Sequence, residues 1–188
     1  MSLIPFGFWA ASGAGGGAGA YDLLETTTLT SSASSVTFSG LGSYSDYAHL
    51  QIRGVARDGS NSTGLESLRL TFNGATNYSY HVLRANGSSF EAFGGSNTRI
   101  PIYDVMGRSG SGADDVFGSF VTDVLDFANT SKNTTTRTLG GGVSGSSRIG
   151  LYSGAYLSTT AVTSLQLESD GADMIAGTRF SLYGIKGA

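Results

Sequence analysis

Residues 68–83, LRLTFNGATNYSYHVL, decide the fold class because two alternating segments flank a turn signal. Leu68, Leu70 and Phe72 occupy every second position, so an extended strand places their side chains on one face. The Asn-Gly dipeptide at 73–74 is typical of a tight β-turn. The YSYHVL segment behind it has a second strand-like pattern. The stretch therefore predicts two strands that pair as a hairpin across this turn.

The same kind of pattern recurs along the chain. Short segments with alternating apolar residues are separated by Gly- and Ser-rich turns, and the 29 glycines fit such a chain better than they fit helices. About eight strands are expected, which favours an all-β fold, an antiparallel β-sandwich and most simply a jelly roll. Besides the opening stretch, the expected strands lie in SSVTFS (34–39), HLQIRGV (49–55), VFGSFVTDVLDF (116–127), RIGLYSG (148–154), VTSLQLES (162–169) and RFSLYGIKG (179–187).

The segment at 116–127 differs from the others because it is apolar on both faces. Val121 and Leu125 fall on one side of an extended strand, and Phe120 and Val124 fall on the other. A strand of this kind is either central and covered on both faces, or it crosses an interface between subunits.

The N-terminal residues are the most apolar part of the chain. Five large apolar side chains, which we predict to bind a partner, stand within SLIPFGFWA: Leu3, Ile4, Phe6, Phe8 and Trp9. Residues 10–20 are almost all Gly and Ala, a composition typical of a flexible tether. We therefore predict two parts, an extended N-terminal anchoring arm at 1–20 and a β-sandwich body at 21–188. Burial of the arm in a partner is favoured; the alternatives are that it folds back over its own sheet edge or packs at a trimer axis.

Composition excludes several classes of partner. Charged residues make up 13% of the chain and the net charge is −3, so no basic surface for nucleic acid is expected. No segment approaches the roughly 20 apolar residues of a membrane span. There is no cysteine, so disulfides and thiolate metal sites are excluded. No Lys or Arg precedes Arg53 and the apolar start is interrupted by Pro5 and Gly7, so a secretory leader is not expected.

No set of residues predicts catalysis. His49 and His81 lie in strand patterns, where a structural imidazole is expected. Asp123 and Asp126 are three residues apart and point to opposite faces of a strand, unlike a glycosidase pair. Asp114 and Asp115 follow a Gly-Ser-rich loop that could hold a hard cation, although a solvated pair is the expectation. The chain is therefore predicted to be a non-enzyme with no cofactor and no metal.

Two further groups of residues could bind a partner. Tyrosines could stack on sugar rings, although most are expected to be core or interface residues; they are Tyr44, Tyr47, Tyr152 and Tyr156. Arginines in or near strands could pair with acids of a partner, although solvation is the default; they are Arg53, Arg57, Arg69 and Arg84.

Three stretches carry a resemblance to a known group: YDLLETTTLTSSASSVTFSGLGSYSDYAHLQIR (21–53), FNGATNYSYHVLRANGSS (72–89) and SGAYLSTTAVTSLQLESDGADMIAGTRFSLYGIKGA (153–188). With the apolar start, they resemble tailed-phage virion structural proteins of the kind found in phages of cyanobacteria and other aquatic bacteria. The resemblance covers most of the chain and carries no catalytic residues.

The resemblance implies a place on the virion. It implies a capsid decoration (cement) protein on the outside of the head, where homotrimers bind the major capsid protein. Three arms of a trimer would act as one multivalent ligand that staples neighbouring capsid subunits against the pressure of packaged DNA. The alternative is a tail-tip or tail-fibre module that binds a receptor or glycan. A third class, a hydrolase or lectin of cellular origin, would need an acid pair or metal site that the strand pattern does not supply.

Overall fold

The computed structural model describes residues 20–108, 116–144 and 147–187, and it is all-β in these residues. One turn of 3-10 helix, η1 (Leu41–Tyr44), interrupts the strands, and no helix of the described residues is long and apolar enough to cross a membrane. The strands are β1 (Tyr21–Thr28), β2 (Ser35–Ser39), β3 (His49–Asp58), β4 (Leu65–Phe72), β5 (Tyr78–Ala85), β6 (Phe90–Asn97), β7 (Ile100–Arg108), β8 (Gly118–Leu125), β9 (Thr135–Val143), β10 (Ser147–Tyr156), β11 (Ser164–Ser169) and β12 (Arg179–Ile185).

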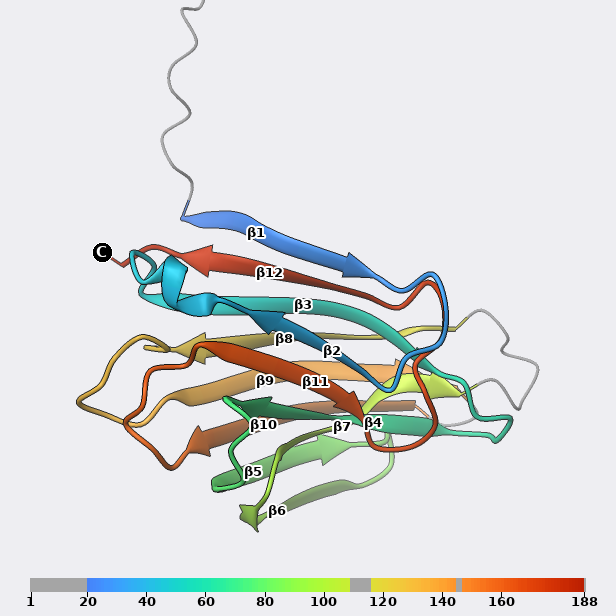
Figure 1. Ribbon diagram of the computed structural model, residues 1–188. Helices are drawn as coiled ribbons and strands as arrows, with labels where there is room; N and C mark the ends of the chain where they lie inside the picture. Colours follow the sequence, from blue (N-terminus) through green and yellow to red (C-terminus); the bar gives the residue numbers. More distant parts are fainter. Residues whose placement is uncertain (1–19, 109–115, 145–146, 188) are drawn as a thin grey trace, which may run out of the picture.

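Hydrogen bonds join these strands into one large open sheet of 12 strands. One part of it runs in the order β1-β12-β3-β8-β9-β10-β5-β6, and the other runs β2-β11-β4-β7. All ladders are antiparallel except a short parallel one that links the two parts, in which Ala56 to Asp58 of β3 face Met106 to Arg108 of β7. In Figure 1 the β2-β11-β4 part lies in front of β8, β9 and β10.

The core lies between these two parts of the sheet. Strand β7 packs against β8, β9, β10 and β5, and the aromatic rings of Phe72, Tyr78 and Tyr156 meet with centroids 5.5–6.3 Å apart. Gly154 of β10 leaves room for the Ile100 side chain of β7, because a Cβ at this position would lie 2.6 Å from Ile100 Cγ2. Burial of these apolar groups is the main contribution that holds the two parts together.

The all-β prediction is confirmed in the described residues, whereas the expected strand count was wrong. About eight strands were expected and the sheet has 12. The four strands that the sequence did not predict are β1, β6, β7 and β9. Of these, β6 (FEAFGGSN) and β9 (TTRTLGGGV) carry few large apolar residues, whereas β7 (IPIYDVMGR) contains Pro101 and is buried on both faces. A two-sheet sandwich or jelly roll is not confirmed, because the β3-β7 ladder makes the described strands one continuous sheet.

The hairpin predicted at 68–83 is also wrong, although its turn exists. Asn73 and Gly74 have φ of 53° and 66°, and the Ala75 N–H donates to the Phe72 carbonyl at 2.9 Å, as a tight turn requires. Strand β4 nevertheless pairs with β7 and β11, while β5 pairs with β6 and β10. The turn sends the chain from one part of the sheet to the other, because the apolar side chains of both strands are then buried in the core between the two parts.

The body begins at β1, which pairs with β12 near the other end of the chain. Tyr21 lies opposite Ile185, and the Lys186 ammonium contacts the Asp22 carboxylate at 2.8 Å. In Figure 1 the start of β1 and the C-terminal end therefore lie close together. The predicted anchor residues Leu3, Ile4, Phe6, Phe8 and Trp9 lie outside the described residues.

Candidate interaction surface

The outer face of β8-β9-β10-β5-β6 carries a continuous row of apolar side chains. The register places Val121 opposite Leu139, Leu139 opposite Leu151, and Leu151 opposite Leu83. Side chains that lie opposite one another in an antiparallel pair point to the same face and touch. Together with Ile149 in the adjacent row, these residues form a surface that we call the outer apolar band: Leu83, Val121, Leu139, Ile149 and Leu151.

The band is open to solvent in the isolated chain. Leu139, Leu83 and Leu151 are 54%, 53% and 48% exposed, and Ile149 is 60% exposed. The alternate residues of the same strands point the other way and are buried in the core, such as Tyr152 of β10 and Val82 of β5. The outer side chains are thus fixed on a rigid sheet but have no covering element among the described residues.

The band contains shallow hollows rather than a deep cavity. Gly141 lies beside Ile149, and Ala85 lies on the other side of it. A hollow of about 620 Å³ lies at Gly141, and a smaller open hollow of about 310 Å³ lies at Ala85. The smaller hollow is lined by Leu83, Arg84, Ala85, Phe90, Leu139, Ile149, Gly150 and Leu151. A hollow of this kind accepts apolar side chains of another molecule but does not enclose a small ligand.

A chain of polar side chains borders the band at its β3 side. The Arg53 guanidinium donates to the Gln51 amide oxygen at 2.8 Å, and the Gln51 amide donates to Asp123 Oδ1 at 2.8 Å. The Arg137 guanidinium donates to the second oxygen, Asp123 Oδ2, at 3.0 Å. Arg53 also lies 4.5 Å over the ring of Tyr183. The hydrogen-bonded, charged border therefore includes Arg53 and Gln51 of β3 and continues through Asp123 of β8 to Arg137 of β9, in the row next to Val121 and Leu139.

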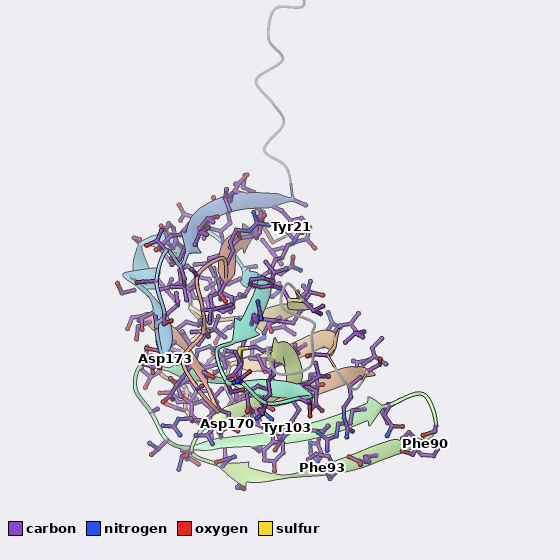
Figure 2. The ribbon with its side chains drawn as sticks, turned by 90° about the vertical axis from the view of Figure 1, so that its right-hand side faces the viewer. Tyr21, Phe90, Phe93, Tyr103, Asp170 and Asp173 are labelled. Carbon is purple, nitrogen blue, oxygen red and sulfur yellow. The ribbon has the colours of Figure 1, made fainter. Side chains whose placement is uncertain are left out.

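At its other side the band ends in an edge strand. Strand β6 pairs only with β5 in the described sheet, and all eight of its residues are exposed. Phe90, at 77% exposed, stands at the far end of the β5-β6 hairpin, which extends past the rest of the described body (Figure 2).

The inner side of this hairpin is tied to the body. The Phe93 ring meets the Tyr103 ring edge-on at a centroid distance of 5.6 Å. The Arg84 guanidinium lies 5.3 Å from both rings and pairs with the Glu91 carboxylate at 2.7 Å and the Asp104 carboxylate at 2.8 Å. These contacts hold the hairpin against β7, so the edge is presented by a fixed element.

The candidate catalytic residues are not brought together. The His49 Nδ1 accepts a hydrogen bond from the Asp126 backbone N–H at 2.9 Å, whereas His81 is exposed beside Gly94. Asp123 belongs to the polar border, and Asp126, with φ of 56° beyond the end of β8, pairs with Lys132.

The described residues also do not meet the requirements of a metal site. Among the described residues, no group of three or more His, Cys, Asp or Glu could hold a metal ion. The predicted loop acids Asp114 and Asp115 lie outside the described residues.

The tyrosines divide between core and surface. Tyr152 and Tyr156 are buried, which makes them core residues rather than a sugar-stacking surface. The Tyr152 hydroxyl donates to the Tyr103 carbonyl at 2.7 Å, and burial raises the pKa of Tyr152 well above its usual range. Tyr44 and Tyr47 are partly buried against the core, and the Tyr47 hydroxyl donates to Asp22 at 2.9 Å.

The strand arginines make contacts within the chain. Arg69 pairs with Asp170, and Arg84 pairs with Glu91 and Asp104. Arg57 is buried, and Arg53 is held at the polar border described above. These arginines are therefore engaged within the same molecule.

Sequence reasoning did not identify the outer apolar band as a site. Val121 was recognised as part of a strand that is apolar on both faces, and an interface was one of the two explanations. Leu139 stands alone in a Thr- and Gly-rich strand, so it gives no periodic signal. Only the register of four strands, one of which (β5) comes from a distant part of the sequence, brings the band together.

Comparison with known proteins finds no family model, no curated protein and no solved structure that matches the chain. The candidate site therefore stands on geometry alone.

Proposed function

We propose that the chain is a non-enzymatic virion structural protein, and specifically a decoration (cement) protein on the outer surface of a tailed-phage capsid. The observation that carries a binding role is the outer apolar band, a row of large exposed side chains on a rigid sheet. The largest exposed apolar patch of a protein is often a functional contact surface. The proposed location on the virion is based on the resemblance of three stretches of the sequence to phage virion proteins.

In this proposal the two apolar regions have different partners. The N-terminal arm, with Leu3, Ile4, Phe6, Phe8 and Trp9, binds the major capsid protein, and the body joins copies into a homotrimer. Full burial of one such side chain is worth about 1.5–3 kcal/mol, and ordering of the tether subtracts part of that gain. Three arms on one trimer bind together, which multiplies the affinity of each. The trimer thereby connects neighbouring capsid subunits.

The test uses shells assembled from the major capsid protein of the genome that encodes this chain. Shells are incubated with the full chain or with a chain lacking residues 1–20, pelleted and quantified by gel densitometry. We expect the full chain to co-sediment at saturating, regular stoichiometry and the truncated chain to remain in the supernatant. Circular dichroism of the truncated chain checks that the body is folded. Full occupancy by the truncated chain would refute the anchoring role of the arm.

The alternative function is a tail-tip or tail-fibre module. Immunogold labelling of purified virions with an antibody against the body distinguishes the two locations. Label spread over the head supports decoration, whereas label confined to the tail supports the alternative.

A further inference from the structure

We propose that the outer apolar band is where copies of this chain contact one another, with the outer faces of β8-β9-β10-β5-β6 turned toward a common symmetry axis. The inference deepens the proposed function, because it identifies the surface that would build the homotrimer. Self-association can be measured without capsids, so its test is independent of the test of capsid binding.

The first argument is the lack of charge on this face. The outward positions of β10, β5 and β6 hold no Lys, Arg, Asp or Glu, although they are solvent-facing in the single chain: Ser147, Ile149, Leu151, Ser153, Ala155, Ser79, His81, Leu83, Ala85, Phe90, Ala92, Gly94 and Ser96. In a sheet with one solvated face, apolar residues that point into the core normally alternate along each strand with polar or charged residues that point to solvent. These strands are instead neutral on the outside, as an interface core is.

The second argument concerns which partner suits a neutral face. In a trimer that turns this same face of each copy toward one axis, the three identical faces lie close together. Any net charge on the face would then repel itself. The two charges on β8 and β9, Asp123 and Arg137, are paired with each other at 3.0 Å, so the outward positions of the described strands from β8 to β6 have no net charge. A second copy of the chain can therefore pack against this face without complementary charges on the two copies.

The third argument is size. The width of the apolar centre is that of five strands spaced about 4.8 Å apart, and its length is that of about four residues with a rise of about 3.4 Å each. Its projected area is therefore roughly 300–400 Å². A stable pairwise contact buries about 800 Å² on each partner. The band and its immediate neighbours supply the apolar centre of such a contact, and the neutral rows beside it and the rest of the exposed β6 strand supply the remaining area.

The experiment compares matched leucine substitutions in the full-length chain. Leu139→Arg places a charge in the band, and Leu23→Arg places one on β1, which β12, β3 and β8 separate from β9; both leucines are exposed, at 54% and 59%. Molar mass is measured by light scattering after size exclusion at concentrations of roughly 1–100 µM, because self-association depends on protomer concentration. Far-UV circular dichroism of each variant checks that its β-structure is retained, because loss of association by itself lowers the thermal unfolding temperature.

We expect the wild-type chain and Leu23→Arg to elute at three times the 19.3 kDa of one chain, and Leu139→Arg to elute as a monomer. A full-length chain with Phe6→Ser and Phe8→Ser should remain a trimer but lose binding to the capsid shells. A monomeric wild-type chain, a trimeric Leu139→Arg variant or a monomeric arm variant would each overturn the inference. Loss of shell binding with the trimer intact would instead support both proposals at once.

Discussion

The contact that replaces the missing β4-β5 hairpin offers a sharp test of how this fold is held together. The Phe72 backbone N–H donates to the Tyr78 hydroxyl at 2.7 Å, and the same hydroxyl donates to the Phe72 carbonyl at 3.1 Å. Strand β7 reaches only as far as Ile100 opposite Leu70, so it does not pair with Phe72. A side chain of β5 therefore completes the backbone bonding of β4. We predict that Tyr78→Phe destabilises the protein although it removes a single oxygen atom.

The magnitude follows from what remains unpaired. Both Phe72 and Tyr78 are fully buried. The Phe72 carbonyl keeps a hydrogen bond from the Ala75 N–H at 2.9 Å, whereas the Phe72 N–H loses its partner. A buried donor left unsatisfied costs about 1–3 kcal/mol. For a chain of this length, a loss of about 2 kcal/mol lowers Tm by about 4–8 °C.

The assay is urea unfolding followed by far-UV circular dichroism, with Tyr156→Phe as the control. Tyr156 is buried in the same aromatic cluster, 5.5 Å from Tyr78 between ring centroids, and its hydroxyl completes no backbone bonding in the described part of the chain. We expect Tyr156→Phe to lower the free energy of unfolding by less than Tyr78→Phe does, because it leaves no buried backbone donor without a partner. Burial raises the pKa of Tyr78, so its hydroxyl is protonated and the difference should persist at every pH below about 10. Equal unfolding free energies of the two variants would refute the assigned role of the hydroxyl.

Two further predictions concern backbone packing and pH. Gly118→Ala would place a Cβ in severe overlap with the Val105 carbonyl oxygen, so we expect a loss of about 3 kcal/mol, whereas Gly95→Ala meets only ordinary contacts and should be nearly neutral in the same unfolding assay. Hydrogen bonds from Lys186 and Tyr47 lower the pKa of Asp22 below its usual 3.8, so its stabilisation is present above that value and is lost as pH falls through the lower folded-state pKa. Asp22→Asn should therefore make the fall of Tm below about pH 4 shallower, and an identical pH profile in the two proteins would contradict this.

Apolar alternation predicted strands with one buried, apolar face, but it did not predict β9, whose buried positions are Thr and Gly. Leu165 and Leu167 of β11 are buried residues of this kind, and their strand was found correctly. Strand β6 could not be found, because every residue of it is exposed and its stability comes from β5 alongside it. The hairpin failed for a related reason: Asn73 and Gly74 fix the turn, but the partner of each strand depends on burial against segments far away in the sequence.

The outer apolar band could not be predicted from the sequence because the pattern of a strand does not show which of its faces is covered. Alternation shows that Ile149 and Leu151 share a face, but it does not show which face of the strand is covered. In β10 both sets of alternate positions carry apolar residues, with Tyr152 inside and Leu151 outside. A strand that is apolar on both sides reads as central and doubly covered, and only the three-dimensional arrangement shows that the outer cover is absent from the described part of the chain.

The edges of the described sheet differ in a way that bears on where self-association occurs. An unpaired strand edge is a risk for uncontrolled pairing, and proteins usually protect it by irregularity, shortness or charge. The β1 edge has a register shift between Leu23 and Glu25, and the β2 edge is only five residues long.

Strand β6 has none of these three protections. It is eight residues long, its register with β5 is regular, and its one charged residue, Glu91, is engaged by Arg84. This unprotected edge borders the neutral outer face, so the two features that favour self-association lie together. A Lys substitution scan along the outward positions of β6 should therefore weaken self-association, whereas the same scan along β2 should leave the oligomer intact, because the β2 edge lies in the other part of the sheet.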